Sequence, residues 1–169
     1  MRGYFGIGAE EISKPMNLGA LMRTSHAFGA RFFFTVAAHP KVRDAYNSDT
    51  SHSFDHMPYY PWASVEEMRL PKGCALVGVE LTDDAVELPR FMHPQAAAYV
   101  LGRERGSLSP ALLARCAHVV QVPTKFCVNV GLAGAIVMYD RLLALGGYPA
   151  RPIMPGGPPP EMTEAPRKR

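Results

Sequence analysis

The chain of 169 residues lacks several features that define common protein classes. Its three cysteines, Cys74, Cys116 and Cys127, form no Cys-x-x-Cys pair, and an odd number does not build a disulfide framework. It has no run of about 18 apolar residues, which a membrane-spanning helix needs, and no signal-peptide pattern at its start. We therefore expect a soluble protein of a reducing compartment, the cytoplasm.

Signatures of nucleotide-binding and hydrolytic enzymes are missing or incomplete. There is no GxxxxGK[ST] phosphate loop and no GxSxG nucleophile elbow. Residues 6–11, GIGAEE, resemble the start of a dinucleotide fingerprint, but the third glycine is absent and Lys14-Pro15 interrupts the required helix. His52 and His56 lie in a predicted loop, where solvated histidines are commoner than a zinc site, so we expect no metal.

Positive charge is not concentrated enough for composition alone to identify a nucleic-acid-binding chain. The net charge is +3, to which residues 1–149 contribute +1 and the last 20 residues contribute +2. A basic surface must therefore be created by folding or by the pairing of two chains.

Apolar runs and turn residues predict alternating strands and helices. Expected strands cover 3–8, 31–38, 74–80, 99–101 and 118–122, and expected helices cover 17–28, 64–70, 110–116 and 129–145, with 39–62 irregular. Asn17 and Ser109 are expected N-caps, and Ser64 with Glu67 forms a capping box. The alternation predicts an α/β domain over 1–149, with a mostly parallel sheet and helices on both faces. The proline-rich segment 150–169 cannot bury a core and is expected to be a disordered tail.

Three segments carry glycines and polar side chains where packing alone does not require them. The first, NLGALMRT over 17–24, opens a helix after a strand. The second, LGRERGSLSP over 101–110, and the third, QVPTKFCVNVGLAGA over 121–135, each lead from a strand into a helix. Taken singly, they read as a capped surface helix, an ordinary loop and a helix packed on the sheet. The carboxyl edge of a parallel sheet is, however, where α/β proteins bind ligands.

In this order and spacing, the three segments resemble the motifs of the TrmH-like (SpoU) branch of the SPOUT superfamily, the RNA 2′-O-ribose methyltransferases. The family patterns are N-x-G-x-x-x-R-T, a strand that ends G-x-E-x-x-G-L, and I-P-M followed by S-x-N-V at the start of the last helix. Within 3–149 the chain matches them at Asn17, Gly19, Arg23, Thr24, Gly102, Glu104, Leu108, Val122, Pro123, Asn129 and Val130. It departs from them at Thr124, in place of methionine, and at Cys127, in place of serine.

The resemblance implies a fold and a cofactor. The C-terminal part of the family's α/β domain forms a deep trefoil knot, which binds S-adenosylmethionine through the loops after three strands. The cofactor-binding residues implied for this chain are Val79, Glu80, Leu101, Gly102, Gly106, Gln121, Val122, Pro123, Cys127, Val128 and Asn129. The family works as a homodimer in which the partner chain completes each active site, and helix 129–145 is a candidate interface element.

The resemblance also implies catalytic roles. Arg23 is expected to act as a protonated guanidinium that favours the developing 2′-alkoxide and binds a phosphate, because a neutral arginine is costly. Asn129 is expected to orient the ribose or the arginine, and Asn17 to position the first motif. Glu104 is expected to hold the arginine or a group of the partner chain. No metal is needed.

The minimal length of the chain resembles the tRNA methyltransferases that act on nucleotide 34 of the anticodon loop, so tRNA is the preferred substrate. A ribosomal RNA substrate and a non-catalytic RNA-binding relative stay open as alternatives. Four aromatic residues of segment 39–62 either stack on RNA bases or attach the segment to the core: Tyr46, Tyr59, Tyr60 and Trp62. Cys127 either occupies space beside the cofactor or acts as a reactive thiol.

Overall fold

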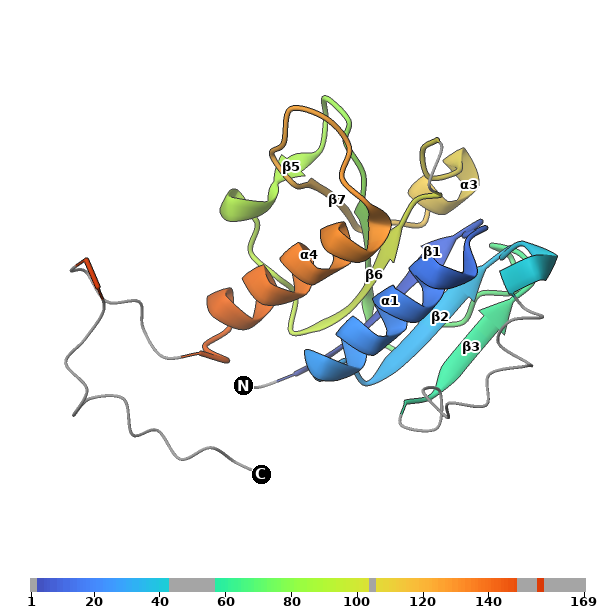
Figure 1. Cartoon of the computed structure of the whole chain (residues 1–169), viewed down its shortest axis with the longest axis horizontal. Coiled ribbons are helices and arrows are strands. Elements are labelled where there is room, and N and C mark those ends of the chain that lie inside the picture. Colours follow the sequence, from blue (N-terminus) through green and yellow to red (C-terminus); the bar gives the residue numbers. More distant parts are fainter. Residues whose placement is uncertain (1–2, 43–56, 104–105, 149–154, 157–169) are drawn as a thin grey trace.

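Parallel strands form the central sheet of the computed structural model (Figure 1). The structure describes residues 3–42, 57–103, 106–148 and 155–156. Within these ranges the strands are β1 (Tyr4–Glu10), β2 (Phe32–Val36), β3 (Tyr59–Trp62), β4 (Ala75–Val79), β5 (Val86–Glu87), β6 (Ala96–Leu101) and β7 (His118–Gln121). Their order across the sheet is β3-β2-β1-β6-β4-β7-β5, and each neighbouring pair is parallel. The predicted α/β class with a mostly parallel sheet is confirmed.

Two long helices, α1 (Pro15–Ala27) and α4 (Val130–Ala144), lie side by side over one face of the sheet (Figure 1). Every second strand residue points to this face, because successive side chains of a strand face opposite sides. The resulting core joins strand and helix residues, among them Phe5, Ile7, Val77, Tyr99, Leu21 and Val137. Within the described ranges, no helix has both the length and the apolar composition needed to span a bilayer.

The opposite face is covered by the short helix α3 (Pro110–Leu113) and by residues of the segment 62–74. Its core contains the rings of Phe32 and Phe34. A Cβ at Gly6 would lie 2.3 Å from the Phe32 ring, and a Cβ at Gly8 would lie 2.5 Å from the Phe34 ring. The glycines of the GIGAEE segment therefore make room for aromatic rings, which explains them without a dinucleotide. Helices on both faces are confirmed.

Small residues allow α4 to approach α1 closely. A Cβ at Gly134 would lie 2.4 Å from Cδ1 of Leu21, so the glycine leaves the space that the leucine fills. A Cβ at Gly131 would contact Cβ of Ala20 at 3.6 Å. These glycines serve packing within one chain, and they bring the N-terminal ends of α1 and α4 together.

A buried polar network lies at the opposite, amino edge of the sheet. Arg141 of α4 is fully buried. Its guanidinium donates to the carbonyl oxygens of Pro94 (2.6 Å), Gln95 (2.7 Å) and Tyr4 (3.2 Å) and to the hydroxyl of Tyr99 (3.0 Å). The Tyr99 hydroxyl lies 2.6 Å from Nδ1 of His93, and Nε2 of His93 lies 2.9 Å from a carboxylate oxygen of Asp140. All these bonds are satisfied when a neutral His93 carries its proton on Nε2, accepts from Tyr99 and donates to Asp140.

Burial governs the proton affinities in this network. It lowers the pKa of His93 from its usual value against the opposing hydrogen bond and charge of Asp140, and the Arg141 charge adds the smallest contribution, which also lowers the pKa. Burial also raises the pKa of Tyr99 to about 12, which keeps its hydroxyl neutral at physiological pH. Both shifts favour the neutral forms that the hydrogen-bond pattern requires.

Of the two predicted helix caps, the structure contradicts one and confirms the other. Helix α1 begins at Pro15, in the first helical turn, where a proline needs no hydrogen-bond donor, and Lys14 occupies the cap position. The expectation that Asn17 caps this helix is therefore wrong, because Asn17 is the third residue of the helix. Helix α3 is capped by Ser109 as predicted: its hydroxyl accepts from the backbone N–H of Leu112 at 3.1 Å. The helix ends at Leu113, earlier than expected.

The segment between β2 and β4 contains the largest errors of the sequence prediction. Residues 64–70 form turns and not the predicted helix. The carboxylate of Glu67 accepts from Ala63, and the carbonyl oxygens of Val65 and Met68 accept from the side chain of Arg115, so side chains take up the groups that a helix needs. Strand β3 was not predicted, because its sequence YYPW contains a proline. It lies at the edge of the sheet, where a proline is tolerated.

Candidate active site

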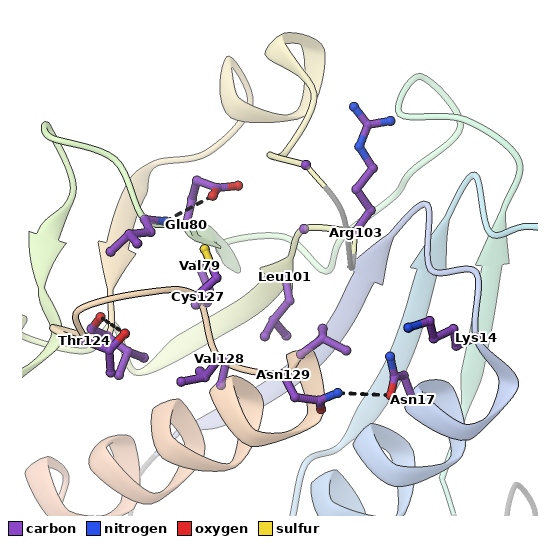
Figure 2. A pocket seen from close by; sticks show the side chains of 16 residues that line it. Lys14, Asn17, Val79, Glu80, Leu101, Arg103, Thr124, Cys127, Val128 and Asn129 are labelled. Atoms are coloured by element: carbon purple, nitrogen blue, oxygen red, sulfur yellow. Dashed lines mark hydrogen bonds between the residues drawn. The ribbon is translucent and has the colours of Figure 1, made fainter.

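A cavity of about 320 Å³ opens at the carboxyl edge of the sheet (Figure 2). Strand β4 lies between β6 and β7, so the loops that follow these three strands meet at one place. Each of the three loops contributes to the lining of the cavity, and the N-terminal ends of α1 and α4 complete it. The position agrees with the general placement of ligand sites at the carboxyl ends of parallel strands.

The cavity brings together most of the residues that the sequence singled out for the cofactor. Those that line it are Val79, Glu80, Leu101, Gly102, Gly106, Val122, Cys127, Val128 and Asn129. Gln121 and Pro123 do not line it. The side chain of Gln121 donates to the carbonyl oxygen of Ala85 at 3.2 Å and so connects the end of β7 to the loop before β5. The prediction of a direct side-chain contact at these two positions finds no support in the cavity.

Asn129 is held in a fixed orientation at the junction of α1 and α4. Its Oδ1 accepts from the backbone N–H of Gly131 at 2.8 Å, which confirms it as the N-cap of α4. Because Oδ1 accepts this bond, the other end of the amide group is the donor Nδ2. It donates to Oδ1 of Asn17 at 3.2 Å (Figure 2). The two asparagines come from the first and third motifs. One amide hydrogen of Asn129 remains for a further acceptor at the cavity.

Of the predicted catalytic residues, Asn17 and Asn129 line the cavity and Arg23 does not. Arg23 is exposed on α1 and does not line the cavity of its own chain. Six residues of helix turn a side chain by about 600°, so Arg23 points away from the side on which Asn17 lies. Glu104 falls outside the described residues, as does Arg105.

Two cations lie at the cavity: the sequence placed Arg103 among the basic residues expected around the site, but gave Lys14 no role. Lys14 lies beside Asn17 and is exposed, and Arg103 follows β6 (Figure 2). Arg103 pairs with Glu11 at 2.6 Å, and both side chains are about half exposed. The sequence held a signal for Lys14, since it directly precedes the first-motif helix. Nothing in the sequence indicated the pairing of Arg103 with a residue 92 positions away.

The loop from β7 to α4 departs from the family pattern at two positions, and both have a place in the structure. The Thr124 hydroxyl donates to the carbonyl oxygen of Phe126 at 2.9 Å, which closes a tight turn. Cys127 is exposed and lines the cavity. Its thiol therefore lies where a ligand in the cavity would contact it.

The aromatic residues that were considered for RNA stacking divide into two groups. The Tyr59 hydroxyl shares a hydrogen bond of 2.8 Å with Thr35, and its ring contacts Phe33, so Tyr59 attaches β3 to the core. Tyr60 is 47% exposed, and its ring stacks on Trp62 at 5.8 Å with an angle of 10° between the planes. Tyr46, like His52 and His56, lies outside the described residues.

Comparison with known proteins places this fold and cavity in a family. The model of the SpoU rRNA Methylase family matches residues 5–139. The tRNA (guanosine(18)-2′-O)-methyltransferase TARBP1 of Mus musculus is 27% identical over 143 residues, which cover 78% of this chain and 9% of the mouse protein. The chain thus corresponds to a small part of that relative.

Solved structures of low sequence identity share the fold. The SpoU methyltransferase AviRb from Streptomyces viridochromogenes has a TM-score of 0.69 at 21% identity, over 87% of this chain and 62% of that one. An AdoMet-bound rRNA methyltransferase from Sinorhizobium meliloti has a TM-score of 0.71 at 18% identity, over 84% and 57%. A structure described as giving insights into 2-OH methylation of C/U34 on tRNA has a TM-score of 0.67 at 18% identity, over 86% and 99%. The family model spans most of the chain, and the predicted resemblance is confirmed: the chain belongs to the SpoU rRNA Methylase family.

Proposed function

We propose that the protein transfers a methyl group from S-adenosylmethionine to a ribose 2′-hydroxyl of RNA, with tRNA as the substrate. The observation that carries the proposal is the cavity, where the second and third motif loops meet the Asn17–Asn129 pair. Family membership and the AdoMet-bound structural neighbour support the cofactor. The mouse relative and the C/U34 neighbour support tRNA. The family description and the Sinorhizobium meliloti neighbour support ribosomal RNA as the alternative substrate.

The residues of the cavity fit this cofactor. Apolar side chains form its walls and suit an adenine ring: Val79, Leu101, Val122, Val128, Val130 and Ala133. Glu80 offers a carboxylate for hydroxyl or ammonium groups, while Lys14 offers a cation for a carboxylate. When bound, S-adenosylmethionine supplies a methyl group on a sulfonium, which is an electrophile that needs no metal.

The demanding part of the reaction is the ribose hydroxyl, which is a very weak acid. The protein must place this oxygen about 3 Å from the methyl carbon and stabilise the charge that develops on it. Asn129 is already oriented by Gly131 and Asn17, so its remaining amide hydrogen is available to orient the ribose. Asn17 acts through Asn129, and Arg23 supplies the positive charge. Glu104 keeps the role that the resemblance implies.

We infer that Arg23 supplies that charge from a second chain, since it does not line the cavity of its own chain. An exposed apolar stripe supports a homodimer: Leu132, Ile136 and Tyr139 are 61%, 39% and 45% exposed along one side of α4. Met16 of α1, 79% exposed, and Phe126, 75% exposed, extend the apolar surface near the cavity. We propose that this surface forms the dimer interface and that each cavity receives Arg23 from the partner.

Two further features of the family complete the proposal. The sheet order, in which β4 separates β6 from β7, is compatible with the C-terminal knot that the family implies. Free thiols at Cys74, Cys116 and Cys127 are compatible with a reducing compartment, and we place the reaction in the cytoplasm.

Two nucleotides of tRNA are candidates for the site of methylation. Nucleotide 34 is supported by the C/U34 neighbour, whose chain is covered almost completely. Nucleotide 18 is supported by the mouse relative. The exposed Tyr60–Trp62 stack is available for an unpaired base of either loop.

A methyl-transfer assay tests the proposal. Purified protein is incubated with labelled S-adenosylmethionine and either bulk tRNA or ribosomal RNA, and the methylated nucleotide is mapped by nuclease digestion and mass spectrometry. We expect 2′-O-methylation of tRNA at one nucleotide. Label only in ribosomal RNA would favour the alternative substrate, and no label in any RNA despite RNA binding would favour a non-catalytic relative.

Mixed dimers test the role of the partner chain. Arg23→Ala and Asn129→Ala chains, each inactive alone, are co-expressed with different tags and purified as the heterodimer. If Arg23 acts on the partner's cavity, one of the two sites combines intact Arg23 with intact Asn129, and about half of the wild-type activity returns. If Arg23 acts within its own chain, both sites carry a defect and the heterodimer stays inactive.

A further inference from the structure

The loop after β6 is fastened by carboxylates from two other strands. The carboxylate of Glu10, the last residue of β1, accepts from both the backbone N–H (2.7 Å) and the hydroxyl (2.6 Å) of Ser109. The carboxylate of Glu80, directly after β4, accepts from the backbone N–H of Leu108 at 2.7 Å. Because β1 and β4 both neighbour β6, the two carboxylates hold consecutive residues of this loop from either side.

The contacts of Glu10 differ from those of the residue that follows it. Glu10 is only 4% exposed, whereas the Glu11 side chain is 43% exposed and forms a surface ion pair with Arg103. Glu11 has a φ of 48°, a left-handed conformation uncommon outside glycine, which ends β1 and directs both carboxylates to the same loop. A buried carboxylate is stabilised only when it accepts hydrogen bonds, and charge-assisted bonds of this length are among the stronger ones.

Ser109 connects this contact to helix α3. Its hydroxyl donates to Glu10 and accepts from the backbone N–H of Leu112, so one side chain fixes both the loop and the helix start. Removal of the Glu10 carboxylate would leave a partly buried backbone N–H without its acceptor, and the loop would have to move to hydrate it.

The fastened loop forms part of the cofactor cavity. Gly102 and Gly106 line the cavity, and Leu108 and Ser109 lie directly after them. A Cβ at Gly102 would approach the Glu80 carboxylate at 3.2 Å and the Leu108 nitrogen at 3.3 Å, so the bond between Glu80 and Leu108 passes close to the cavity wall. A shift of Ser109 would therefore change the shape of the cavity.

We propose that Glu10 is a positioning residue of the cofactor site, which sets the affinity for S-adenosylmethionine by holding Ser109 and, with it, the cavity-lining segment that begins at Gly106. The inference rests on the proposed function of this cavity. Glu10 does not line the cavity and acts only through the loop. The Glu10–Ser109 pair thus determines cofactor binding without contact to the cofactor.

The test compares Glu10→Ala, Glu10→Gln, Ser109→Ala and the double variant Glu10→Ala/Ser109→Ala with the matched control Glu11→Gln. Affinity for S-adenosylhomocysteine is measured by titration calorimetry, the KM for S-adenosylmethionine and kcat by methyl transfer, and exchange of the amides of 106–113 by hydrogen-exchange mass spectrometry. We expect Glu10→Ala to weaken binding and raise KM at least tenfold, with kcat within about threefold. Glu10→Gln keeps an acceptor for Ser109 and should recover most of the affinity, and Glu11→Gln should stay within about twofold of the wild type.

The outcomes separate the inference from the proposed function. The loss of affinity in the double variant should be smaller than the sum of the two single losses, because both changes remove the hydrogen bond between the Ser109 hydroxyl and the Glu10 carboxylate. The inference is overturned if Glu10→Ala binds as the wild type does, if Glu11→Gln loses as much, or if the two single effects add. Faster amide exchange at 108–112 with unchanged affinity also overturns it. Failure of the wild type to bind S-adenosylhomocysteine overturns the proposed function itself.

Discussion

The two edges of the sheet differ in the polar side chains that they leave exposed. At the amino edge, the side chains of Arg141, Tyr99 and His93 are buried and bond to one another or to backbone carbonyls. At the carboxyl edge, Asn129 and Lys14 are exposed around a cavity. The same strands lead to both edges. Buried polar groups with partners in the protein fix the fold at both edges, and at the carboxyl edge they include Glu10, which accepts from Ser109. Exposed groups around a cavity occur where the strands end, which is where α/β proteins bind ligands.

The largest expected effect is on stability, at the amino edge. Arg141→Met removes the donors for three backbone carbonyls and the Tyr99 hydroxyl, and we expect the free energy of unfolding to fall by about 3 kcal/mol or more. Urea unfolding followed by circular dichroism measures this. Arg90→Met is the matched control, since Arg90 is 81% exposed and pairs with Glu87 at the surface. An equally small loss in both variants would mean that the network does not stabilise the fold.

The second effect is on catalysis, at the carboxyl edge. Arg23→Ala should slow methyl transfer at least about 100-fold, because the developing alkoxide loses its cation. Affinity for S-adenosylhomocysteine should stay within about threefold, since Arg23 lies outside the cavity of its own chain. Arg23→Lys should rescue little, because an ammonium does not reproduce the planar fork of a guanidinium. A loss of affinity as large as the loss of rate would contradict the assignment.

The division between the edges explains what the sequence could predict. The core strands, α1 and α4 follow from apolar runs and end signals, and the three motif loops meet because their strands neighbour one another. Arg141 bonds to Tyr99 and Tyr4, which lie 42 and 137 positions away from it in the sequence. No local sequence pattern indicates such pairing. The same holds for the bond between Glu10 and Ser109.

The sequence failed where side chains compete with the backbone. Asn17 is a residue type that N-cap positions favour, but the helix begins earlier, at Lys14-Pro15. The side-chain amide of Asn17 accepts a hydrogen bond from Asn129 instead of capping the helix. The predicted capping box does not start a helix at 64–70, because the Arg115 side chain binds carbonyl oxygens that the helix would require. Arg115 comes from a distant part of the chain, so the local sequence does not reveal this contact. Arg23 is not among these failures, because the first motif was expected apart from the three cofactor loops and Arg23 does not line the cavity.

A third, smaller effect concerns pH and again the amino edge. His93 has a lowered pKa in the folded protein, so it stays neutral while the unfolded chain takes up a proton below its ordinary pKa of about 6.5. The contribution of His93 to the free energy of unfolding is therefore fully present above about pH 6.5, and it is lost as the pH falls below that value. Asp140, Tyr99 and Arg141 are the titratable or charged groups that face the ring.

Urea unfolding between pH 5 and 7.5 measures this effect. The wild type should lose stability on acidification, and His93→Gln should lose less over the same range. His118→Gln is the control, because His118 is exposed and should leave the slope as it is. An unchanged slope in His93→Gln would show that another group causes the loss.

The smallest effect is expected at the cavity itself. Cys127→Ser should change the rate of methyl transfer less than about tenfold, which corresponds to 1.4 kcal/mol, because the N-cap Asn129 keeps the loop frame. Methyl transfer is measured before and after thiol alkylation. We expect the serine variant to be active and to resist alkylation. A serine variant as inactive as the alkylated wild type would show that the sulfur takes part in the chemistry.

The central claim, that a ribose 2′-hydroxyl accepts the methyl group at this cavity, is tested most directly with a single altered substrate. A tRNA that carries a 2′-deoxy sugar only at the mapped nucleotide is compared with the unmodified tRNA at saturating S-adenosylmethionine. The account predicts full methylation of the unmodified tRNA, as a 2′-O-methylnucleoside, and none of the deoxy tRNA, although both bind equally well. Continued transfer to the deoxy tRNA, or label on a base, would contradict it.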